Sequence, residues 1–92
     1  MSIRRTVRKV IDGDTIEVNR KIDGTNRVRL EGVNAPELPG QRGRKAQNQL
    51  KGLIGGDRVT LSVVATDKYN RKVATVRKGR RNINKAMRDR GY

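Results

Sequence analysis

The fold is decided by one short stretch, VIDGDTIEV at residues 10–18, and by the segments on either side of it. Residues 15–19 alternate between apolar and polar side chains, which is typical of a strand with one buried face. The dipeptide Asp12-Gly13 precedes them and predicts a type I′ turn, because Asp and Gly tolerate positive φ. Residues 3–11 are rich in β-branched side chains and predict the partner strand. The stretch therefore predicts an antiparallel hairpin.

A third strand and a helix are expected after this hairpin. A second Asp-Gly pair, Asp23-Gly24, predicts a turn into a strand over residues 27–33. Residues 34–45 contain two prolines and two glycines, so they are expected to form a loop. From Ala46 onward, apolar residues recur at i, i+4, i+7 and i+8, the stripe of a short amphipathic helix. Gly55-Gly56 is expected to end this helix by supplying the left-handed conformation.

The second half of the chain adds two strands and a final helix. Alternating residues predict strands over residues 59–63 and 72–77, with a polar loop at residues 65–70 between them. Asn82 is a suitable N-cap for a last helix, which Gly91 is expected to stop.

The resulting order is β-β-β-α-β-β-α. It predicts a mainly β, α+β fold: a five-stranded OB-type barrel with a helix between strands three and four and a short C-terminal helix. We expect residues 1–92 to form a single domain. Such an order by itself indicates binding rather than a particular reaction.

Charge is the strongest signal in the composition. Lys and Arg number 23 against 9 Asp and Glu, which gives a net charge of +14. Such a field favours nucleic acid as the partner, through phosphate neutralisation and counterion release. An acidic membrane surface is the competing partner, but no amphipathic helix with a large apolar face is evident. We therefore expect a nucleic-acid partner, no membrane and a monomeric protein.

Two residue types are missing from the chain. It has no His and no Cys, which excludes a Ser-His-Asp triad, an imidazole general base and a thiolate metal site. Any hydrolysis must therefore rest on carboxylates, Arg, Lys and a hard metal ion. The lack of Cys also fits a reducing compartment, and the first residues lack the apolar region of a signal peptide. We expect a cytoplasmic rather than a secreted protein.

Asp14 is the first candidate for chemistry. Asp12-Gly13 accounts for a turn without help from the residue after it. The pair Asp23-Gly24 is expected to make the same turn, and it is followed by Thr25 rather than by a carboxylate. Asp14 is thus an addition that the turn does not require, which makes it a candidate metal ligand.

Two loops carry the other candidates. Pro36 locks its own φ and extends the residue before it, so Glu37 is held more rigidly than an ordinary loop carboxylate. The polar loop before the last strand contains DKYNR at residues 67–71. Taken alone, Glu37 is a solvated carboxylate, and the segment at residues 67–71 is a basic loop on a basic protein.

Together the three segments resemble the staphylococcal nuclease, or thermonuclease-like, family. They read VIDGDTIEV, VRLEGVNAPE and DKYNRKVA, in that order along the chain. The resemblance runs from about residue 7 to residue 91 and includes the expected helices. It implies an OB-type barrel that hydrolyses nucleic acid with calcium, breaking the bond to the 5′ oxygen and leaving 3′-phosphate ends.

The resemblance implies a calcium site built from three positions. Asp14 matches the family's aspartate that binds calcium directly, and Ala35 matches the residue whose backbone carbonyl reaches the metal. Asn34 stands where the family usually has a second metal-binding aspartate. Its amide oxygen can still coordinate calcium, but the site loses one negative charge, so calcium is expected to bind more weakly.

The resemblance also implies phosphate contacts and a general base. Arg29 and Arg71 match the two arginines that contact the scissile phosphate. Glu37 matches the glutamate proposed as general base for the attacking water. Lys68 and Tyr69 match the pair that contacts a terminal phosphate of the bound nucleotide.

Arg80 and Arg81 lie in a strongly basic stretch, residues 71–90, which has nine bases against one acid. We expect this stretch to present a basic surface continuous with the cleft. Exposed bases of this kind position a phosphate backbone without reading its sequence.

Three functions remain open. The leading interpretation is a calcium-dependent nuclease that acts on DNA and RNA with little sequence specificity. The alternative is a catalytically weak or inactive nuclease-like domain that binds nucleic acid through its basic surface, and Asn34 is the residue that favours it. A structural RNA-binding protein explains the charge but leaves the pair Asp14 and Glu37 unexplained.

Overall fold

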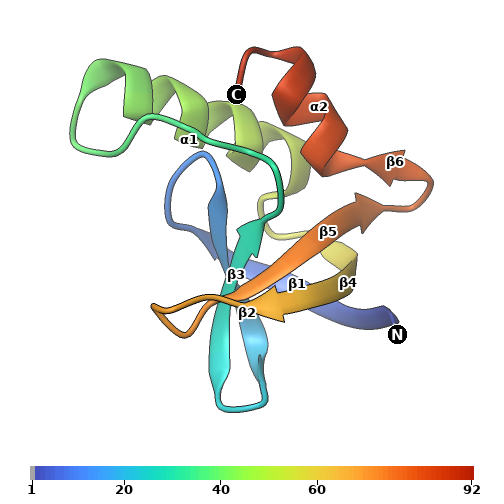
Figure 1. Cartoon of the computed structure of the whole chain (residues 1–92). Coiled ribbons are helices and arrows are strands. Elements are labelled where there is room, and N and C mark those ends of the chain that lie inside the picture. Colours follow the sequence, from blue (N-terminus) through green and yellow to red (C-terminus); the bar gives the residue numbers. More distant parts are fainter. Residues whose placement is uncertain (1) are drawn as a thin grey trace.

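The computed structural model describes residues 2–92, and its sheet curls into a barrel (Figure 1). The strands are β1 (Ser2–Val10), β2 (Thr15–Ile22), β3 (Thr25–Leu30), β4 (Arg58–Thr66), β5 (Lys72–Lys78) and β6 (Arg81–Asn82). Neighbours follow the order β3-β2-β1-β4-β5-β6 and pair antiparallel. β3 also pairs with β5 in parallel, with Val28 opposite Lys72 and Leu30 opposite Ala74. This pairing closes a five-stranded mixed barrel and leaves β6 outside it.

Two helices lie at one end of the barrel, α1 (Gln41–Ile54) and α2 (Ile83–Asp89) (Figure 1). α1 buries the apolar stripe that begins at Ala46, and α2 buries Ile83 and Met87. Neither helix of residues 2–92 has the length and apolar character needed to cross a membrane. The expected α+β barrel, with a helix between its third and fourth strands and a short C-terminal helix, is confirmed.

The start of α1 differs from the expected one, since residues 41–45 are helical rather than part of the loop. The glycine taken as a loop signal, Gly43, is buried inside the helix, although glycine disfavours a helix by about 1 kcal/mol relative to alanine. A Cβ at this position would overlap the backbone carbonyl of Glu37. Gly43 therefore lets α1 pack directly on the loop that carries Glu37.

The expected type I′ turn at Asp12-Gly13 is wrong. Neither residue has positive φ, whereas Asp23 has φ +47° and Gly24 has φ +87°, as that turn requires. A Cβ on Gly13 would lie 2.5 Å from the Cβ of Ala35 and 2.6 Å from the Cβ of Ala46. Gly13 is thus explained by close packing against the loop after β3 and against α1, and the two Asp-Gly pairs are not equivalent.

The expected C-terminal ends of both helices and the expected N-cap of α2 are confirmed. Asn82 caps α2, because its Oδ1 accepts a hydrogen bond of 3.0 Å from the N–H of Lys85. Gly91 follows α2 with φ +95°, and Gly56 follows α1 with φ +75°, so both supply the left-handed conformation.

Asn84 of α2 is a buried polar residue that the sequence analysis did not single out. Its Oδ1 accepts from the N–H of Val76 at 2.8 Å. Its amide group donates to the carbonyls of Glu31 at 2.9 Å and Ala74 at 3.0 Å. Asn84 thereby fastens α2 to the place where β3 and β5 meet.

Candidate active site

One hollow of about 210 Å³ gathers the residues singled out from three distant segments. It is lined by Asp12, Asp14, Arg29, Asn34, Ala35, Glu37 and Arg71. Every residue expected to hold calcium, contact the scissile phosphate or act as base is among them. The barrel accounts for this convergence, because β3 is flanked on one side by β2 and on the other by β5. Arg29 is consequently in register with Thr15 of β2 and with Val73 of β5.

Asp14 is buried, and both oxygens of its carboxylate accept hydrogen bonds. Oδ1 accepts from the hydroxyl of Thr15 at 2.9 Å, and Oδ2 accepts from the N–H of Ala35 at 3.1 Å. Its backbone carbonyl accepts from the N–H of Leu30 at 2.8 Å. These bonds join the start of β2 to the end of β3 and to the loop beyond it, so Asp14 also has a structural role.

Arg29 reaches into the hollow from β3. Its Nη2 lies 3.7 Å from Oδ2 of Asp14 and donates to Oδ1 of Asn34 at 2.8 Å. Its Nη1 donates to the carbonyl of Leu30 at 3.4 Å. The guanidinium is therefore held in place by a carboxylate, an amide and a backbone carbonyl before any substrate arrives.

Arg71 faces the hollow from the loop before β5. Its Nε forms an ion pair of 2.7 Å with Oδ2 of Asp67, and its Nη1 donates to the hydroxyl oxygen of Thr15 at 3.4 Å. Oδ1 of Asp67 accepts from the N–H groups of Tyr69 and Arg71, each at 2.9 Å. Burial acts to raise the pKa of Asp67, but the bonds from Arg71 and Tyr69 together lower it below its usual value.

Asp67 and Asp12 are the site residues that sequence reasoning missed. The sequence predicts Asp67 as part of a basic loop, yet it fixes the guanidinium of Arg71. The sequence predicts Asp12 as a turn residue, yet it lines the hollow and accepts from the N–H of Asp14 at 3.0 Å. Burial, together with the neighbouring Asp14 carboxylate, raises the pKa of Asp12. The available signal was spacing: Asp12 lies two residues before Asp14, and Asp67 lies four residues before Arg71.

Glu37 is exposed at the edge of the hollow. Among residues 2–92 its carboxylate has no hydrogen-bond or ion-pair partner, so it is available to a water molecule or substrate. Its backbone is fixed by Pro36 on one side and by the close approach of Gly43 on the other. Its expected role as a base stays a prediction.

Lys68 and Tyr69 lie beside the hollow rather than in it. Tyr69 is 67% exposed and lines a neighbouring hollow of about 490 Å³, which shares Glu37 and Arg71 with the first. The Nζ of Lys68 is 5.2 Å and the Cζ of Arg71 is 5.3 Å from the centre of its ring. Two cations thus flank an exposed aromatic face, an arrangement suited to a nucleotide.

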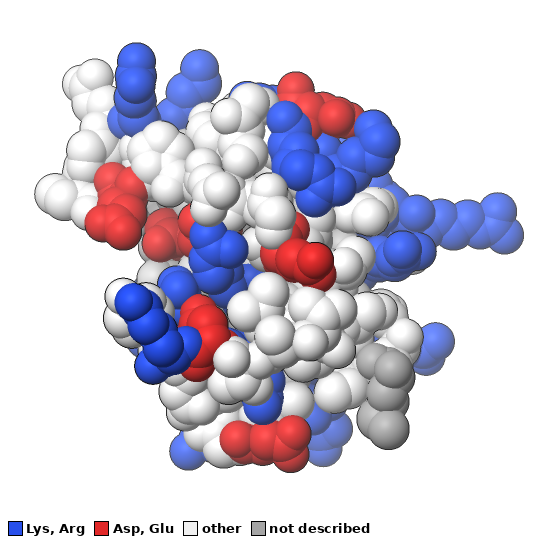
Figure 2. All heavy atoms as spheres, viewed as in Figure 1, with Lys and Arg blue, Asp and Glu red and all other residues white. Residues whose placement is uncertain are grey.

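Arg80 and Arg81 lie at the turn between β5 and β6, away from this cluster. Arg81 lines a separate hollow with Lys85 and Arg90 of the α2 region, and that hollow shares no residue with the active-site one. Figure 2 shows basic side chains over α2 and β6 at the upper right, and uncharged and acidic surface between them and the basic side chains at the left of the molecule. On this face the expected continuity with the cleft is therefore interrupted.

Comparison with known proteins shows the family of the chain. A family model that describes staphylococcal nuclease homologues matches residues 27–92. The chain belongs to this family. The matched range holds Arg29, Glu37 and Arg71, whereas Asp14 lies before it.

Several relatives of this staphylococcal nuclease homologue carry the name "Uncharacterized endonuclease", and two of them illustrate the similarity. One, from Escherichia coli O157:H7, is 38% identical over 76 residues, which are 80% of this chain and 48% of the relative. The other, from Haemophilus influenzae, is 34% identical over 79 residues, which are 86% of this chain and 44% of the relative. "Endonuclease YhcR" of Bacillus subtilis is 32% identical over 101 residues, covering 94% of this chain and 8% of that protein. The chain thus spans about half the length of the first two.

The oxygen atoms of this staphylococcal nuclease homologue suit a hard cation. Among residues 2–92, no three acidic, His or Cys side chains form a metal-binding group by themselves. A calcium ion would therefore depend on mixed donors: the carboxylate of Asp14, the amide oxygen of Asn34, the carbonyl of Ala35, and water. All three residues line the hollow, so the chemistry of the donor set fits calcium. Their present bonds to Arg29 and to one another must rearrange for the ion to bind.

Proposed function

We propose that this protein is a calcium-dependent nuclease that hydrolyses phosphodiester bonds of DNA and RNA with little sequence specificity. One observation carries the proposal: two guanidiniums held by separate partners line the same small hollow as the carboxylate of Glu37, which has no partner within residues 2–92. Nuclease-named relatives of the same family support it. The net charge of +14 supports a polyanionic substrate.

The two arginines would bind the scissile phosphate. Each guanidinium presents planar pairs of N–H donors that match phosphate oxygens. Arg29 is oriented by Asp14 and Asn34, and Arg71 is oriented by Asp67. Because these donors are already oriented, little reorganisation is needed when negative charge grows on the phosphoryl oxygens.

Glu37 would activate the water molecule. Its carboxylate accepts a proton from the water as the water oxygen forms a bond to phosphorus. The bond from phosphorus to the 5′ oxygen breaks, and a proton from solvent completes the 5′ hydroxyl. Calcium, when bound by Asp14, Asn34 and the Ala35 carbonyl, supplies positive charge beside the phosphoryl oxygens.

Low sequence specificity follows from what the site presents. Its arginines address phosphate groups, which are common to every nucleotide, and such contacts carry no sequence information. Around the neighbouring Tyr69, stacking and cation contacts tolerate any base.

The test is plasmid nicking with calcium, and then with excess chelator. We expect nicking that chelator abolishes, and a loss on the order of 10²-fold or more in Glu37→Gln with DNA binding nearly unchanged. Glu31→Gln is the matched control, because Glu31 is an exposed acid outside the hollow. Chelator-resistant nicking, or full activity in Glu37→Gln, would contradict the proposal.

A second candidate is a domain of this family that binds nucleic acid without cutting it. The observation that favours it is Asn34, which gives the hollow one carboxylate fewer and is bonded to Arg29. In that case the wild-type protein binds DNA, but no calcium concentration produces nicking. The same assay, run beside a binding measurement, separates the two candidates.

A further inference from the structure

The candidate active site borders two larger hollows through different residues. The Tyr69 hollow, described above, shares Glu37 and Arg71 with it. The other, which we call the Tyr92 hollow, shares Asn34 and Ala35 with it and has a volume of about 530 Å³. An enzyme that cuts within a strand needs room for the chain on each side of the scissile bond. The Tyr92 hollow offers this space on the side of the active site that is away from Tyr69.

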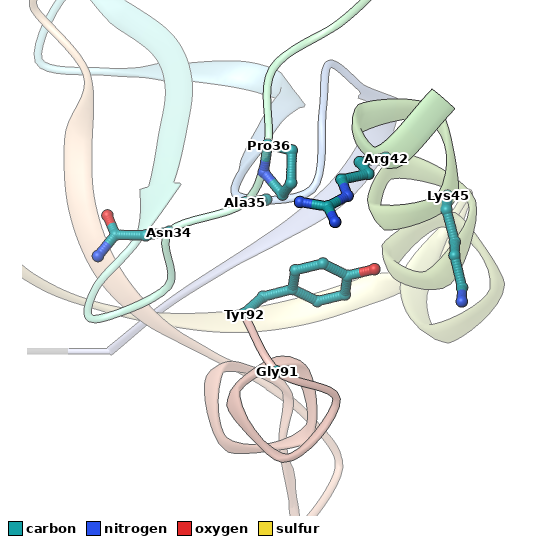
Figure 3. Close-up of a pocket in the computed structure, with 7 residues that line it drawn as sticks. All are labelled: Asn34, Ala35, Pro36, Arg42, Lys45, Gly91 and Tyr92. Atoms are coloured by element: carbon teal, nitrogen blue, oxygen red, sulfur yellow. The ribbon is translucent and has the colours of Figure 1, made fainter. Parts of the chain in front are cut away.

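The Tyr92 ring is part of the lining of this hollow (Figure 3). In the close-up, the guanidinium of Arg42 lies between the Pro36 ring and the Tyr92 ring, and the tyrosine hydroxyl points toward α1. Lys45 extends from the next turn of the same helix, while the Asn34 side chain points away from Arg42 and Lys45, and its Oδ1 accepts from Arg29 of the active site. The hollow therefore combines an aromatic face with two cations.

Tyr92 is anchored by its backbone. Its N–H donates to the carbonyl of Met87 at 3.1 Å, and its carbonyl accepts from the N–H of Asn34 at 2.9 Å. Its side chain packs partly against the hydrophobic core. The ring thus has a fixed position relative to the loop that carries Asn34 and Ala35.

Arg42 and Lys45 of α1 are two exposed cations. Within residues 2–92, neither Arg42 nor Lys45 makes a side-chain hydrogen bond or an ion pair. The helix reads QRGRKAQNQLKGLI, so it contains no acidic residue that could neutralise them. Figure 2 shows exposed basic side chains over α1 at the upper left. Unpaired cations beside a phosphodiester site favour a further phosphate group.

We infer that the Tyr92 hollow binds the nucleotide that follows the scissile bond on the side away from Tyr69. The base stacks on the Tyr92 ring, and the phosphate lies against Arg42 and Lys45. The volume lies within the range of about 300–1,000 Å³ that is usual for small-molecule sites. This inference rests on the proposed nuclease function, since it extends the track of that same substrate.

Tyrosine emission tests the position of the base directly. The chain has two Tyr and no Trp, so in Tyr69→Leu all intrinsic emission comes from Tyr92. Hexathymidylate, added in chelator so that nothing is cut, should cause a saturable loss of this emission. Inorganic phosphate should cause none, because it carries no base. Bound hexathymidylate with unchanged Tyr92 emission would overturn the inference, and so would phosphate binding that hexathymidylate does not displace.

Charge removal tests the phosphate contact. Arg42→Ala with Lys45→Ala should weaken hexathymidylate binding roughly tenfold. The slope of log K against log salt should also become shallower by up to about two units. Arg44→Ala with Lys51→Ala is the matched control, because it removes two exposed bases of the same helix that do not line the hollow. Equal effects in the two double variants would overturn the inference.

An aromatic substitution completes the test. Tyr92→Leu keeps an apolar side chain against the core but removes the ring, so hexathymidylate binding should weaken roughly tenfold. Tyr92→Phe keeps the ring and should bind hexathymidylate like the wild type. Circular dichroism and thermal melting show whether each variant is folded. If hexathymidylate lowers Tyr92 emission but the protein cleaves no DNA, the subsite is supported and the nuclease activity is rejected. If the protein cleaves DNA but Tyr92 emission does not change, the nuclease activity is supported and the subsite is rejected.

Discussion

The guanidinium of Arg29 donates a hydrogen bond of 2.8 Å to the side-chain oxygen of Asn34. The same guanidinium lies 3.7 Å from Asp14. An arginine expected to bind phosphate and two expected calcium ligands therefore form one connected cluster. A change in any one of the three must alter both the affinity for metal and the orientation of the arginine.

Asn34→Asp should tighten calcium binding. The substitution adds a negative charge to the hollow, and although part of it pairs with Arg29, the attraction for a divalent cation rises. We expect roughly tenfold tighter binding and a lower calcium concentration for half-maximal cleavage. Titration calorimetry on both proteins measures this. Asn48→Asp is the control, since it adds the same charge on the exposed surface of α1, and a similar gain there would point to a general charge effect.

Arg29→Lys and Arg71→Lys should each lose activity although the charge is kept. Lysine cannot reproduce the planar pair of donors, nor the bonds that orient each guanidinium. The expected loss is on the order of 10²-fold in turnover, comparable to removing a preorganised donor. Arg77→Lys, at an exposed position of β5, provides the comparison in the same nicking assay. Wild-type turnover in both site variants would reject the proposed phosphate contacts.

Asp67→Asn should destabilise the protein in a pH-dependent way. The folded protein lowers the pKa of Asp67, so the carboxylate contributes stability above its unfolded pKa of about 3.9. That contribution is lost as pH falls through the lowered value. At pH 7 we expect a loss of about 1 kcal/mol in the free energy of unfolding. Urea unfolding of both proteins between pH 7 and pH 3 should show the difference shrinking with acid, and a constant difference would contradict this.

Two alanine substitutions in α1 should have opposite effects. Gly43→Ala places a Cβ against the carbonyl of Glu37, so we expect a loss of about 1–3 kcal/mol and slower cleavage as Glu37 shifts. Gly52→Ala meets no atom within 4 Å and should stabilise the helix by up to about 1 kcal/mol without affecting cleavage. Thermal unfolding and the nicking assay measure both effects. A stabilised and fully active Gly43→Ala would show that the loop is free to move.

Arg80→Ala with Arg81→Ala should weaken binding to all DNA sequences alike. Both residues are exposed and lie outside the active-site hollow, so cleavage at saturating substrate should barely change. The slope of log K against log salt should become shallower by up to about two units if both contact phosphates. A salt titration with labelled duplexes measures it. An unchanged slope would mean that DNA does not reach the turn between β5 and β6.

The barrel was predictable because its signals are local and repeated. Alternating apolar residues marked the barrel strands, and caps such as Asn82 marked the helix ends. Residue spacing gave less information where tertiary contacts dominate. Gly13 and Gly43 resembled turn and loop glycines, but each is required by a neighbouring backbone or side chain that lies far away in the sequence or across a loop.

The candidate site was predictable as a set of residues but not as a network. The resemblance indicated Asp14, Arg29 and Arg71, and the structure brings them around one hollow. The ion pair of Arg71 with Asp67 and the bond from Arg29 to Asn34 depend on side-chain orientation, which sequence does not encode in any periodic pattern. The Tyr92 hollow was likewise invisible, because its walls come from three separated segments.

The parallel seam between β3 and β5 bears on how the protein folds. β1 to β3 can form by short hairpins, whereas the seam joins strands that are separated by α1 and β4. Pairing β3 with β5 therefore closes a longer loop, costs more chain entropy and is expected late in folding. It is held by only three register pairs and by the buried Asn84. Arg29 and Arg71 stand on opposite sides of it. Local opening of the seam would thus separate the two arginines while the hairpins persist, so catalytic competence should be the last property gained in folding and the first lost in denaturant.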